Sequence, residues 1–362
     1  MKDAIRFESG FTLPGGRRIG VGAPCFVIAE LSGNHNGSLE RALDLVRAAK
    51  SAGADAVKLQ TYTADTLTID CDQPWFRISG DNAWKGRTLY DLYQEASTPW
   101  DWHEALFAEA RALNLEVFST PFDITAVDFL EKLGANLHKI ASFEIVDLEL
   151  VQRVARTGKP VIMSTGMASE SEIQEAVEAF WATGNHQLIL LKCTSAYPSP
   201  PAGMNIRAIP VLSARFGVPA GLSDHCLTEQ AAVAAVALGA CVVEKHITLA
   251  RSDGGPDASF SLEPEEFRRT VELLRETEQV LGSGVLGAGV AESSNVVFRR
   301  SIFAVRDIAV GEVLTRDNIR VIRPGHGLAP KHIGAVLGRR AAQVIARGTP
   351  LGWALLEGGA RG

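Results

Sequence analysis

The stretch CVVEKHIT, residues 241–248, begins with the apolar residues of a buried strand and then places Glu244, Lys245 and His246 directly after Val243. Charged side chains are almost never fully buried unless they are paired, so structure alone gives a poor reason for this ending. The stretch is the last of eight short apolar runs that alternate with segments of helical periodicity. The eight runs are residues 26–31, 56–62, 116–122, 137–142, 160–165, 188–194, 219–225 and 241–248.

This alternation predicts an α/β fold of the (β/α)8 TIM barrel class, because eight β–α units over about 250 residues match its usual size. One predicted helix is SLERALDLVRAAKSAG, in which Leu39, Leu43 and Val46 recur at helical spacing and Gly53 marks the end. A doubly wound open sheet is the alternative. The GxGxxG motif that would support it does not follow the first run.

The rest of the chain divides around this barrel. We expect an N-terminal β-hairpin over residues 1–25 that closes the barrel bottom, the barrel over 26–281, a Gly- and Ser-rich linker over 282–297 and a small β-rich domain over 298–362. A long insert, residues 63–98, follows the second run, and long βα loops usually cover the site of a barrel. Trp84 and Tyr90 of the insert either offer apolar surface to a substrate or pack the insert itself.

Composition sets broad limits on function. The chain has 362 residues, of which 46% are hydrophobic and 22% charged, as is ordinary for a soluble enzyme. A net charge of -6 without a long basic run argues against a nucleic-acid partner. Five cysteines without a CxxC pair indicate reduced core residues. Neither a signal peptide nor an apolar run of membrane-spanning length is visible, so we expect a cytoplasmic protein without a membrane partner.

Polar residues gather at the carboxyl ends of the predicted strands, where barrel enzymes carry their chemistry. Along the last strand, the period of two places Glu244 and His246 on one face, and Lys245 on the other, where it would pair with a helix. The strand-end residues are Glu30, Lys58, Gln60, Thr120, Lys139, Ser142, Glu144, Thr165, Lys192, Ser195, Tyr197, Ser223, Asp224, His225, Glu244, Lys245 and His246.

Two histidines end neighbouring strands, since His225 closes the seventh run and His246 lies in the eighth. Two imidazoles can share one divalent metal and leave positions open for water and substrate. A single histidine is more often a satisfied core or surface residue, and the paired placement favours the metal. Asp257, in the GGPD stretch after the last run, is a further ligand, a residue that supports the ligands, or part of a turn.

Lys58 and Lys139 at different strand ends predict a cationic pocket for phosphate or carboxylate. The alternative is that one of them forms a Schiff base, as in aldolases. Regular alternation puts Lys139 and Ser142 on opposite faces, so both reach the pocket only if the strand breaks near Ala141. Glu30 suits a general base or a contact to a sugar hydroxyl, and it is equally suited to an ion pair with Lys58.

The sequence resembles the sialic acid synthase family in nine motifs spread between about residues 20 and 355. These are AELSGNHNGS, DAVKLQTYT, STPFD, MSTGMAS, KCTSAYPSP, GLSDH, EKHIT, GGPD and RPGHGL. The resemblance implies a phosphoenolpyruvate-condensing (β/α)8 barrel followed by an antifreeze-like SAF domain. It also implies a domain-swapped homodimer, in which the SAF domain of one chain caps the barrel of the other.

Within that family the sequence is most similar to the pseudaminic acid synthases, notably in KGRTLYDLYQEASTPWDWH, residues 85–103. Neuraminate synthases usually read CTNxYP and RPGNG where this chain has Ser195 and His326, so the roles of these two residues are open. The implied reaction joins phosphoenolpyruvate to the aldehyde of 2,4-diacetamido-2,4,6-trideoxy-L-altrose and releases phosphate. N-acetylneuraminate or legionaminate synthesis by the same mechanism is the alternative.

The resemblance also implies roles for individual residues. His225 and His246 would hold a divalent metal, typically Mn²⁺ with Mg²⁺ or Co²⁺ as possibilities, that polarises the aldehyde oxygen. Arg323 would reach the sugar from the partner chain, or it is a plain surface residue. The expected catalytic residues are Glu30, Glu244 and His246. The expected substrate-binding residues are Lys58, Gln60, Lys139, Ser142, Ser195, Tyr197, Ser223, Asp257 and Arg323.

Overall fold

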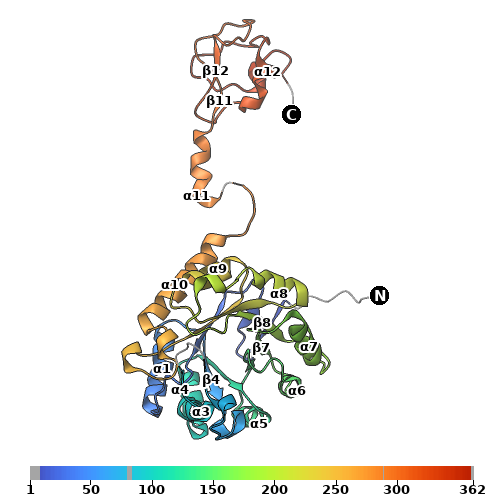
Figure 1. Cartoon of the computed structure of the whole chain (residues 1–362). Helices are drawn as coiled ribbons and strands as arrows, with labels where there is room; N and C mark the ends of the chain where they lie inside the picture. The colour runs from blue at the N-terminus through green and yellow to red at the C-terminus, as the bar shows by residue number, and fades with distance from the viewer. Residues whose placement is uncertain (1–8, 80–83, 288, 360–362) are drawn as a thin grey trace. The chain divides into compact units, whose positions relative to one another are not determined.

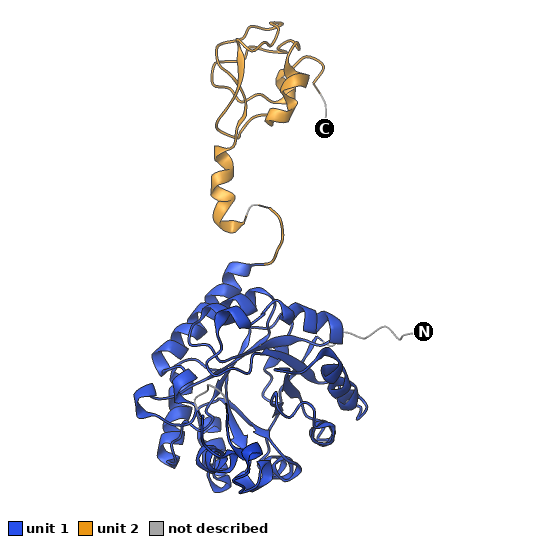
Figure 2. Ribbon diagram, viewed as in Figure 1, with its two compact units in different colours: residues 1–282 blue, residues 283–362 orange. Residues whose placement is uncertain are grey.

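The computed structural model describes residues 9–79, 84–287 and 289–359. The chain divides into two compact units, residues 1–282 and residues 283–362 (Figure 2). In the described part of the chain, no helix combines the length and the apolar character that crossing a lipid bilayer requires.

The first unit is a closed barrel of eight parallel strands surrounded by helices (Figure 1). Each strand pairs with the next one along the chain, and β10 closes the ring by pairing with β3. Each of the eight predicted runs contains one strand, so the predicted fold class is confirmed. The strands are β3 (Phe26–Glu30), β4 (Ala56–Thr61), β5 (Glu116–Pro121), β6 (His138–Ile140), β7 (Val161–Ser164), β8 (Leu188–Cys193), β9 (Ala220–Asp224) and β10 (Val242–His246).

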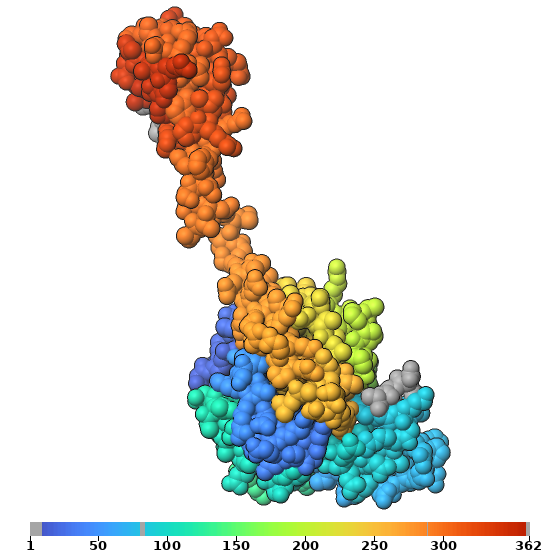
Figure 3. Space-filling view, turned by 90° about the vertical axis from the view of Figure 1, so that its left-hand side faces the viewer, coloured from blue at the N-terminus to red at the C-terminus, as the bar shows by residue number. Residues whose placement is uncertain are grey.

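Helices connect successive strands and form the outer layer. At the seam of the barrel, α10 packs against both α9 and α1, so segments from the two ends of the unit lie side by side (Figure 3). Two helices of this unit, α2 and α3, lie in the insert after β4. The helices are α1 (Leu39–Ser51), α2 (Ala64–Leu67), α3 (Leu89–Ala96), α4 (His103–Ala112), α5 (Ile124–Lys132), α6 (Leu148–Ala155), α7 (Glu170–Trp181), α8 (Ala208–Phe216), α9 (Gln230–Ala237) and α10 (Pro264–Leu281).

Local sequence explains where α1 begins and ends. The Ser38 hydroxyl accepts a hydrogen bond from the Arg41 backbone N–H at 3.3 Å, which satisfies one of the free donors of the first turn. The buried face includes Leu45 and Val46. Gly53 follows the helix with a φ of 86°, a left-handed conformation that suits glycine.

An apolar layer fills the barrel below its mouth. Strands β1 (Gly10–Thr12) and β2 (Arg18–Gly20) pair as an antiparallel hairpin, and side chains from this hairpin pack into the same cluster as the inward residues of the barrel. Residues 1–8 of the expected hairpin lie outside the described residues. Because the bottom is filled, a ligand reaches the strand ends from the mouth. The cluster is Phe11, Leu13, Ile19, Phe26, Ile28, Ala56, Phe118, Leu137, Ile162, Ile189, Leu191, Cys241 and Val242.

The second unit has a core of its own. Strands β11 (Ser301–Ala304) and β12 (Ile319–Ile322) pair antiparallel, and a short helix, α12 (Ile333–Val336), follows them. Within the expected linker, α11 (Val290–Ser293) forms a single helical turn. The core of this unit comprises Ile302, Ala304, Ile308, Leu314, Ile319, Val336, Ala341, Ile345, Leu351 and Leu356.

Candidate active site

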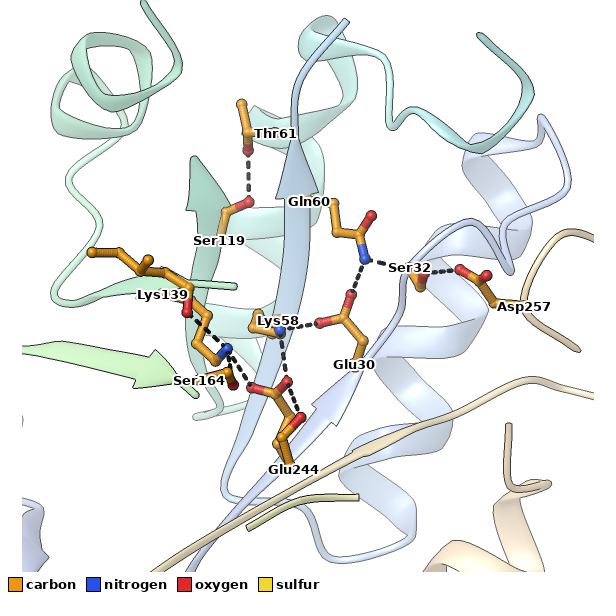
Figure 4. A network of polar contacts seen from close by, with 12 residues as sticks. Glu30, Ser32, Lys58, Gln60, Thr61, Ser119, Lys139, Ser164, Glu244 and Asp257 are labelled. Atoms are coloured by element: carbon orange, nitrogen blue, oxygen red, sulfur yellow. Dashed lines mark hydrogen bonds and ion pairs between the residues drawn. The ribbon is translucent and has the colours of Figure 1, made fainter. Parts of the chain in front are cut away.

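A buried polar network occupies the mouth of the barrel, where β3, β4 and β10 end (Figure 4). Lys58 Nζ donates to Glu244 Oε1 at 2.9 Å and lies 3.0 Å from Glu30 Oε2. Gln60 Nε2 donates to Glu30 Oε1 at 3.0 Å. The ion pair between Glu30 and Lys58 that the sequence left open is therefore present, and it lies inside the mouth rather than on the surface.

Lys139 joins this network from the other side of the mouth. Its Nζ donates to Ser164 Oγ at 2.6 Å and lies 3.9 Å from Glu244 Oε2 (Figure 4). Strand β6 ends at Ile140, so the alternation of faces stops before Ser142. Ser142 Oγ accepts from the Gly166 backbone N–H at 3.1 Å. The strand break that the sequence required near Ala141 is thus found in the structure.

The ends of β6, β7 and β8 converge on Gly166. A Cβ atom on Gly166 would lie 2.4 Å from Ser195 Oγ and 2.7 Å from Ser142 Oγ, so a larger residue here would force both serine side chains to move. Two hydroxyl groups together with an ammonium group such as that of Lys139 are donors that bind a phosphate group well. From β9, Ser223 Oγ donates to Glu244 Oε1 at 3.3 Å.

The charges of the network are set by burial and by one another. Burial raises the pKa of Glu244, but Lys139 and Lys58 outweigh it and lower that pKa to about 2. Burial lowers the pKa of Lys58, yet Glu244 and Glu30 outweigh it and raise the pKa above its usual range. Burial lowers the pKa of Lys139 to about 8 and raises the pKa of Glu30. Lys58 and Glu244 are therefore held ionised, whereas Lys139 titrates just above neutral pH.

The two histidines lie together at the ends of β9 and β10. The centroids of the His225 and His246 rings are 5.2 Å apart. His225 Nδ1 is 3.2 Å from the Thr194 carbonyl oxygen, which fixes the orientation of this ring. His246 Nδ1 is buried and has no hydrogen-bond partner among the described residues.

This pair fits a divalent cation that has two protein ligands and takes its other ligands from water or substrate oxygens. No group of three His, Cys, Asp or Glu side chains in the described part of the chain is arranged to hold a metal. Cys193 is a close neighbour of the pair. Burial raises the pKa of the Cys193 thiol, but hydrogen bonding and charge from His225 together with hydrogen bonds from Ser142 and Ser195 outweigh it and lower the pKa to about 6.

Asp257 connects to the network through Ser32. It accepts hydrogen bonds from Ser32 Oγ and, at 3.4 Å, from the Gly33 backbone N–H. Gln60 Nε2 donates to Ser32 Oγ at 3.2 Å, so a chain of contacts runs from Glu30 to Asp257 (Figure 4). Of the three readings that the sequence left open, these contacts favour a residue that supports the site.

Comparison with known proteins assigns the family. Residues 45–286 match the NeuB family model, and residues 299–357 match the SAF domain model. The chain belongs to the NeuB family. It is 44% identical to the pseudaminic acid synthase of Campylobacter jejuni over 90% of this chain and 95% of that protein. It is 38% identical to the N,N'-diacetyllegionaminic acid synthase of Legionella pneumophila over 92% of this chain and 95% of that protein.

A solved structure agrees with this assignment. The N-acetylneuraminic acid synthetase of Leptospira borgpetersenii is 31% identical and superposes with a TM-score of 0.72, covering 81% of this chain and 97% of that one. The protein is therefore an enzyme of the sialic acid and pseudaminic acid synthase family, built as a TIM barrel with a C-terminal SAF domain.

Aromatic residues cover part of the mouth of this NeuB-family enzyme. Trp84 Nε1 donates to the Pro256 carbonyl oxygen at 2.7 Å, and the Trp84 ring lies 5.4 Å from that of Tyr197. The Tyr197 ring in turn lies 4.6 Å from His225. Tyr90 instead donates to Asp65 at 3.1 Å, within the insert. Trp84 is thus part of the cover over the site, and Tyr90 packs the insert itself.

Arg323 lies in the second unit, just after β12, and so belongs to a different unit from the network of the barrel. Ser301 Oγ donates to the Pro324 carbonyl at 2.7 Å and accepts from the Gly327 backbone N–H at 2.9 Å. This clamp fixes the loop that presents the exposed side chains of Arg323 and His326.

The sequence analysis predicted the wrong partner for Lys245 and did not select Ser164 or Phe260. Lys245 was expected to pair with a helix, but its Nζ donates to Asp224 Oδ2 of the neighbouring strand at 2.7 Å. Ser164, which binds Lys139, could have been found because it lies in one of the eight runs. Nothing in the sequence pointed to Phe260, whose ring lies 5.0 Å from His246.

Proposed function

We propose that this chain condenses phosphoenolpyruvate with 2,4-diacetamido-2,4,6-trideoxy-L-altrose and water to give pseudaminic acid and phosphate. The observation that carries the choice of sugar is the 44% identity to a pseudaminic acid synthase, against 38% to a legionaminic acid synthase of similar coverage. N-acetylneuraminate or legionaminate synthesis by the same mechanism is the second candidate.

Phosphoenolpyruvate would be held by the cationic side of the mouth. The hydroxyls of Ser142 and Ser195 and the Lys139 ammonium group offer donors to the phosphate, and Lys58 offers charge to the carboxylate. Holding both ends of this small anion fixes one face of its double bond toward the second substrate, which removes much of the entropic cost of the encounter.

The bond-forming step uses the electron pair of the enol double bond. Carbon 3 of phosphoenolpyruvate bonds to the aldehyde carbon of the sugar, and the aldehyde oxygen takes up a proton. Water then adds to carbon 2, and the bond from carbon 2 to the phosphate oxygen breaks, which releases inorganic phosphate. Glu30 is suited to accept the proton of that water because burial raises its pKa and Gln60 holds its other oxygen in place. Glu244 would keep the two lysines charged and oriented.

A divalent metal, Mn²⁺ in the first place and Mg²⁺ or Co²⁺ as alternatives, would be held by His225 and His246. When bound it supplies Lewis acidity to the aldehyde oxygen. The support is the 5.2 Å separation of the two rings and the unpartnered Nδ1 of His246. Phosphate release should stop in a chelator and return when metal is added back, and the His225→Ala chain should be inactive but folded. Full activity in the chelator would contradict the metal.

The competing mechanism is a Schiff base with pyruvate at Lys58 or Lys139. A pKa of about 8 leaves a useful fraction of Lys139 unprotonated, so this alternative deserves its own experiment. Borohydride added in the presence of pyruvate would reduce such a Schiff base to a stable adduct of increased mass. We expect no adduct on either lysine, and an adduct on one of them would replace the proposed mechanism.

The direct test of function is an assay with phosphoenolpyruvate, Mn²⁺ and one sugar at a time. The sugars are the proposed altrose derivative, the corresponding precursor of legionaminic acid and N-acetylmannosamine. Phosphate release and the mass of the product report turnover and identity. The proposed sugar should give the highest kcat/KM, and a preference for either of the other two would select the second candidate.

We further propose that the enzyme works in the cytoplasm as a domain-swapped homodimer in which Arg323 of the partner subunit completes each site. Two observations support this proposal. The Arg323 side chain is exposed. Residues 283–362 are basic, with 11 Lys and Arg and five Asp and Glu, whereas the whole chain is acidic, with 36 Lys and Arg and 42 Asp and Glu. The all-thiol state of the cysteines agrees with the compartment.

Complementation tests the exchange of domains. The Arg323→Ala and His225→Ala chains should each be inactive alone, and mixing them after mild dissociation should restore part of the activity. A mixture that stays inactive although mass measurements show mixed dimers would contradict the proposal.

A further inference from the structure

Phe260 contacts both rings of the histidine pair. Its side chain is 2% exposed, and its ring centroid lies 5.0 Å from that of His246 and 6.2 Å from that of His225. The interplanar angles of 72° and 79° make these edge-to-face contacts, an arrangement that aromatic rings prefer. The rings of Tyr197 and Trp84 also pack against Phe260, at 5.1 and 6.2 Å. One buried phenyl ring thus touches both imidazoles that we expect to hold the metal.

The two histidines differ in what holds their rings. His225 Nδ1 is 3.2 Å from the Thr194 carbonyl oxygen, so a hydrogen bond orients this ring. A metal-binding histidine usually has such a bond at its second nitrogen. His246 is 8% exposed, and no residue in the described part of the chain supplies a hydrogen-bond partner to its Nδ1. Packing against its neighbours therefore has a larger part in orienting the His246 ring.

The backbone fixes Phe260 beside His246. The Leu262 N–H donates to the His246 carbonyl oxygen at 2.9 Å, and the Thr248 N–H donates to the Leu262 carbonyl oxygen at 2.9 Å. Ile247 and Leu262 form a parallel bridge, so the segment that carries Phe260 runs along the end of β10. Because Phe260 lies two residues before Leu262, the position of its ring is tied to the backbone of His246.

Two buried polar side chains hold the turn that carries Phe260. Ser261 Oγ donates to the Asp257 carbonyl oxygen at 2.7 Å and accepts from Asn34 Nδ2 at 2.8 Å. Asn34 Nδ2 also donates to the Ile247 carbonyl oxygen at 2.8 Å. Ser261 and Asn34 are both 0% exposed. These bonds join the turn to the residue that follows β10, so the two segments cannot shift independently.

We propose that Phe260 is a positioning residue, which holds the His246 ring in the orientation that binds the divalent metal. This inference rests on the metal of the proposed function and extends it from the two ligands to the residue that orients one of them. A smaller apolar side chain at this position would remove the edge-to-face contact and leave space in which the imidazole can rotate. Metal binding would then have to order the ring, which costs affinity.

The sharpest test is Phe260→Leu with Mn²⁺ alone as the probe. Electron paramagnetic resonance of free Mn²⁺, in the absence of both substrates, measures the dissociation constant for the unmodified chain and for the variant. We expect this constant to rise about tenfold, as is usual when a residue that supports a metal ligand is lost. Turnover should recover when the Mn²⁺ concentration is raised by the same factor, since both histidines are still present.

Phe180→Leu is the matched control. Phe180 on α7 is 0% exposed, but it belongs to the core between the helices and the outer faces of the strands. Both variants should lower the melting temperature, and only Phe260→Leu should change the Mn²⁺ dissociation constant. An equal weakening of Mn²⁺ binding in both would assign the effect to lost stability and overturn the proposal.

Ser261→Ala provides a second variant, which leaves the phenyl ring in place. It removes the hydroxyl that binds the Asp257 carbonyl oxygen and Asn34, so the turn that carries Phe260 is held less tightly. We expect the Mn²⁺ dissociation constant to rise about threefold, in line with the modest net energy of a hydrogen bond.

Each outcome has a distinct meaning. Turnover by the unmodified chain with an unchanged Mn²⁺ dissociation constant in both Phe260→Leu and Ser261→Ala overturns the role of Phe260 and leaves the proposed function intact. If Phe260→Leu fails to fold, the result for Ser261→Ala decides alone. Failure of the unmodified chain to bind Mn²⁺ would overturn the metal of the proposed function and this inference together.

Discussion

The two faces of β10 carry two buried ion pairs that differ in how many of their charged atoms have hydrogen-bond partners. On the outer face, Lys245 Nζ donates to Asp224 Oδ2 at 2.7 Å and to the Cys226 and Thr228 carbonyl oxygens at 2.8 and 3.4 Å. Asp224 Oδ1 also accepts from the Cys226 N–H at 2.9 Å. All three protons of the lysine have acceptors, as a pair that serves the structure requires.

On the inner face, Glu244 is less well satisfied. Lys58 and Ser223 bind its Oε1, but its Oε2 is buried without a hydrogen-bond partner among the described residues, since Lys139 at 3.9 Å is too distant for one. His246, two residues on, has an unpartnered Nδ1 as well. Adjacent residues of one strand therefore show how a complete pair holds the barrel together, whereas an incomplete one keeps bonding capacity for a ligand.

The largest effect should come from breaking the complete pair. Lys245→Met leaves the Asp224 carboxylate buried without a cation, which should cost about 3 to 5 kcal/mol of unfolding free energy. Urea unfolding of the purified chain measures this cost. Arg215→Ala, which removes an exposed ion pair with Glu170, is the control and should change stability very little. A cost near zero for Lys245→Met would remove the contrast between the faces.

Glu244→Gln should affect catalysis more than stability, in contrast to Lys245→Met. The amide keeps the shape of the side chain but removes the charge that holds Lys58 and Lys139, so we expect kcat to fall about 100- to 1,000-fold. The loss of stability should be smaller than that of Lys245→Met, because water reaches the mouth once the network opens. Steady-state kinetics and unfolding on the same sample check both. If stability fell more than for Lys245→Met, the inner pair would be structural too.

The titration of Lys139 should appear in the pH profile. Burial lowers its pKa to about 8, in opposition to Glu244, while Lys58, Cys193 and Glu30 also act on it. Below pH 8 the ammonium form is available to bind phosphate, and above pH 8 it loses its proton. The kcat/KM for phosphoenolpyruvate should thus fall toward tenfold per pH unit above about pH 8.

Initial rates between about pH 6.5 and 9.5 measure this profile. Lys139→Arg is the matched variant, because a guanidinium stays charged over this range. Whatever the absolute rate of the Lys139→Arg variant, its kcat/KM for phosphoenolpyruvate should not decline near pH 8. The same decline in both proteins would assign the titration to another group.

The smallest effect should come from Ser223→Ala. Its hydroxyl bonds Glu244 at 3.3 Å, a long contact whose loss leaves Lys58 to hold the same oxygen. We expect kcat to fall less than about tenfold, in line with the modest net energy of one hydrogen bond. A loss as large as that of Glu244→Gln would show that this hydroxyl binds substrate directly.

Much of the barrel was predictable because strand residues and helix residues follow different periods. The alternation along residues 241–248 put Glu244 and His246 on the inner face and Lys245 on the outer one, as the structure has them. The short β6 shows the limit of this reasoning: its end at Ile140, which lets Ser142 reach the mouth, depends on how the following loop folds.

The partners of the site residues were less predictable than their faces. The predicted partner of Lys245 was wrong. Periodicity along a strand gives the face of a residue, but the register between β9 and β10 is what brings Asp224 beside Lys245. Phe260 and Ser32 were missed for a similar reason, since loops that are distant in sequence place them at the mouth. The roles of His225, His246 and Arg323 remain proposals with the tests given above.

The seam between β3 and β10 has a consequence for the order in which the barrel forms during synthesis. Phe26 pairs with Val242, and the hairpin with Phe11 and Ile19 packs into the layer that these strands help to build. A ribosome adding 5 to 20 residues per second needs roughly 10 to 45 s to pass from one partner strand to the other. Throughout that interval the apolar residues of the hairpin and of β3 have no closed barrel to pack into. They therefore stay at risk of aggregation until β10 has been synthesised.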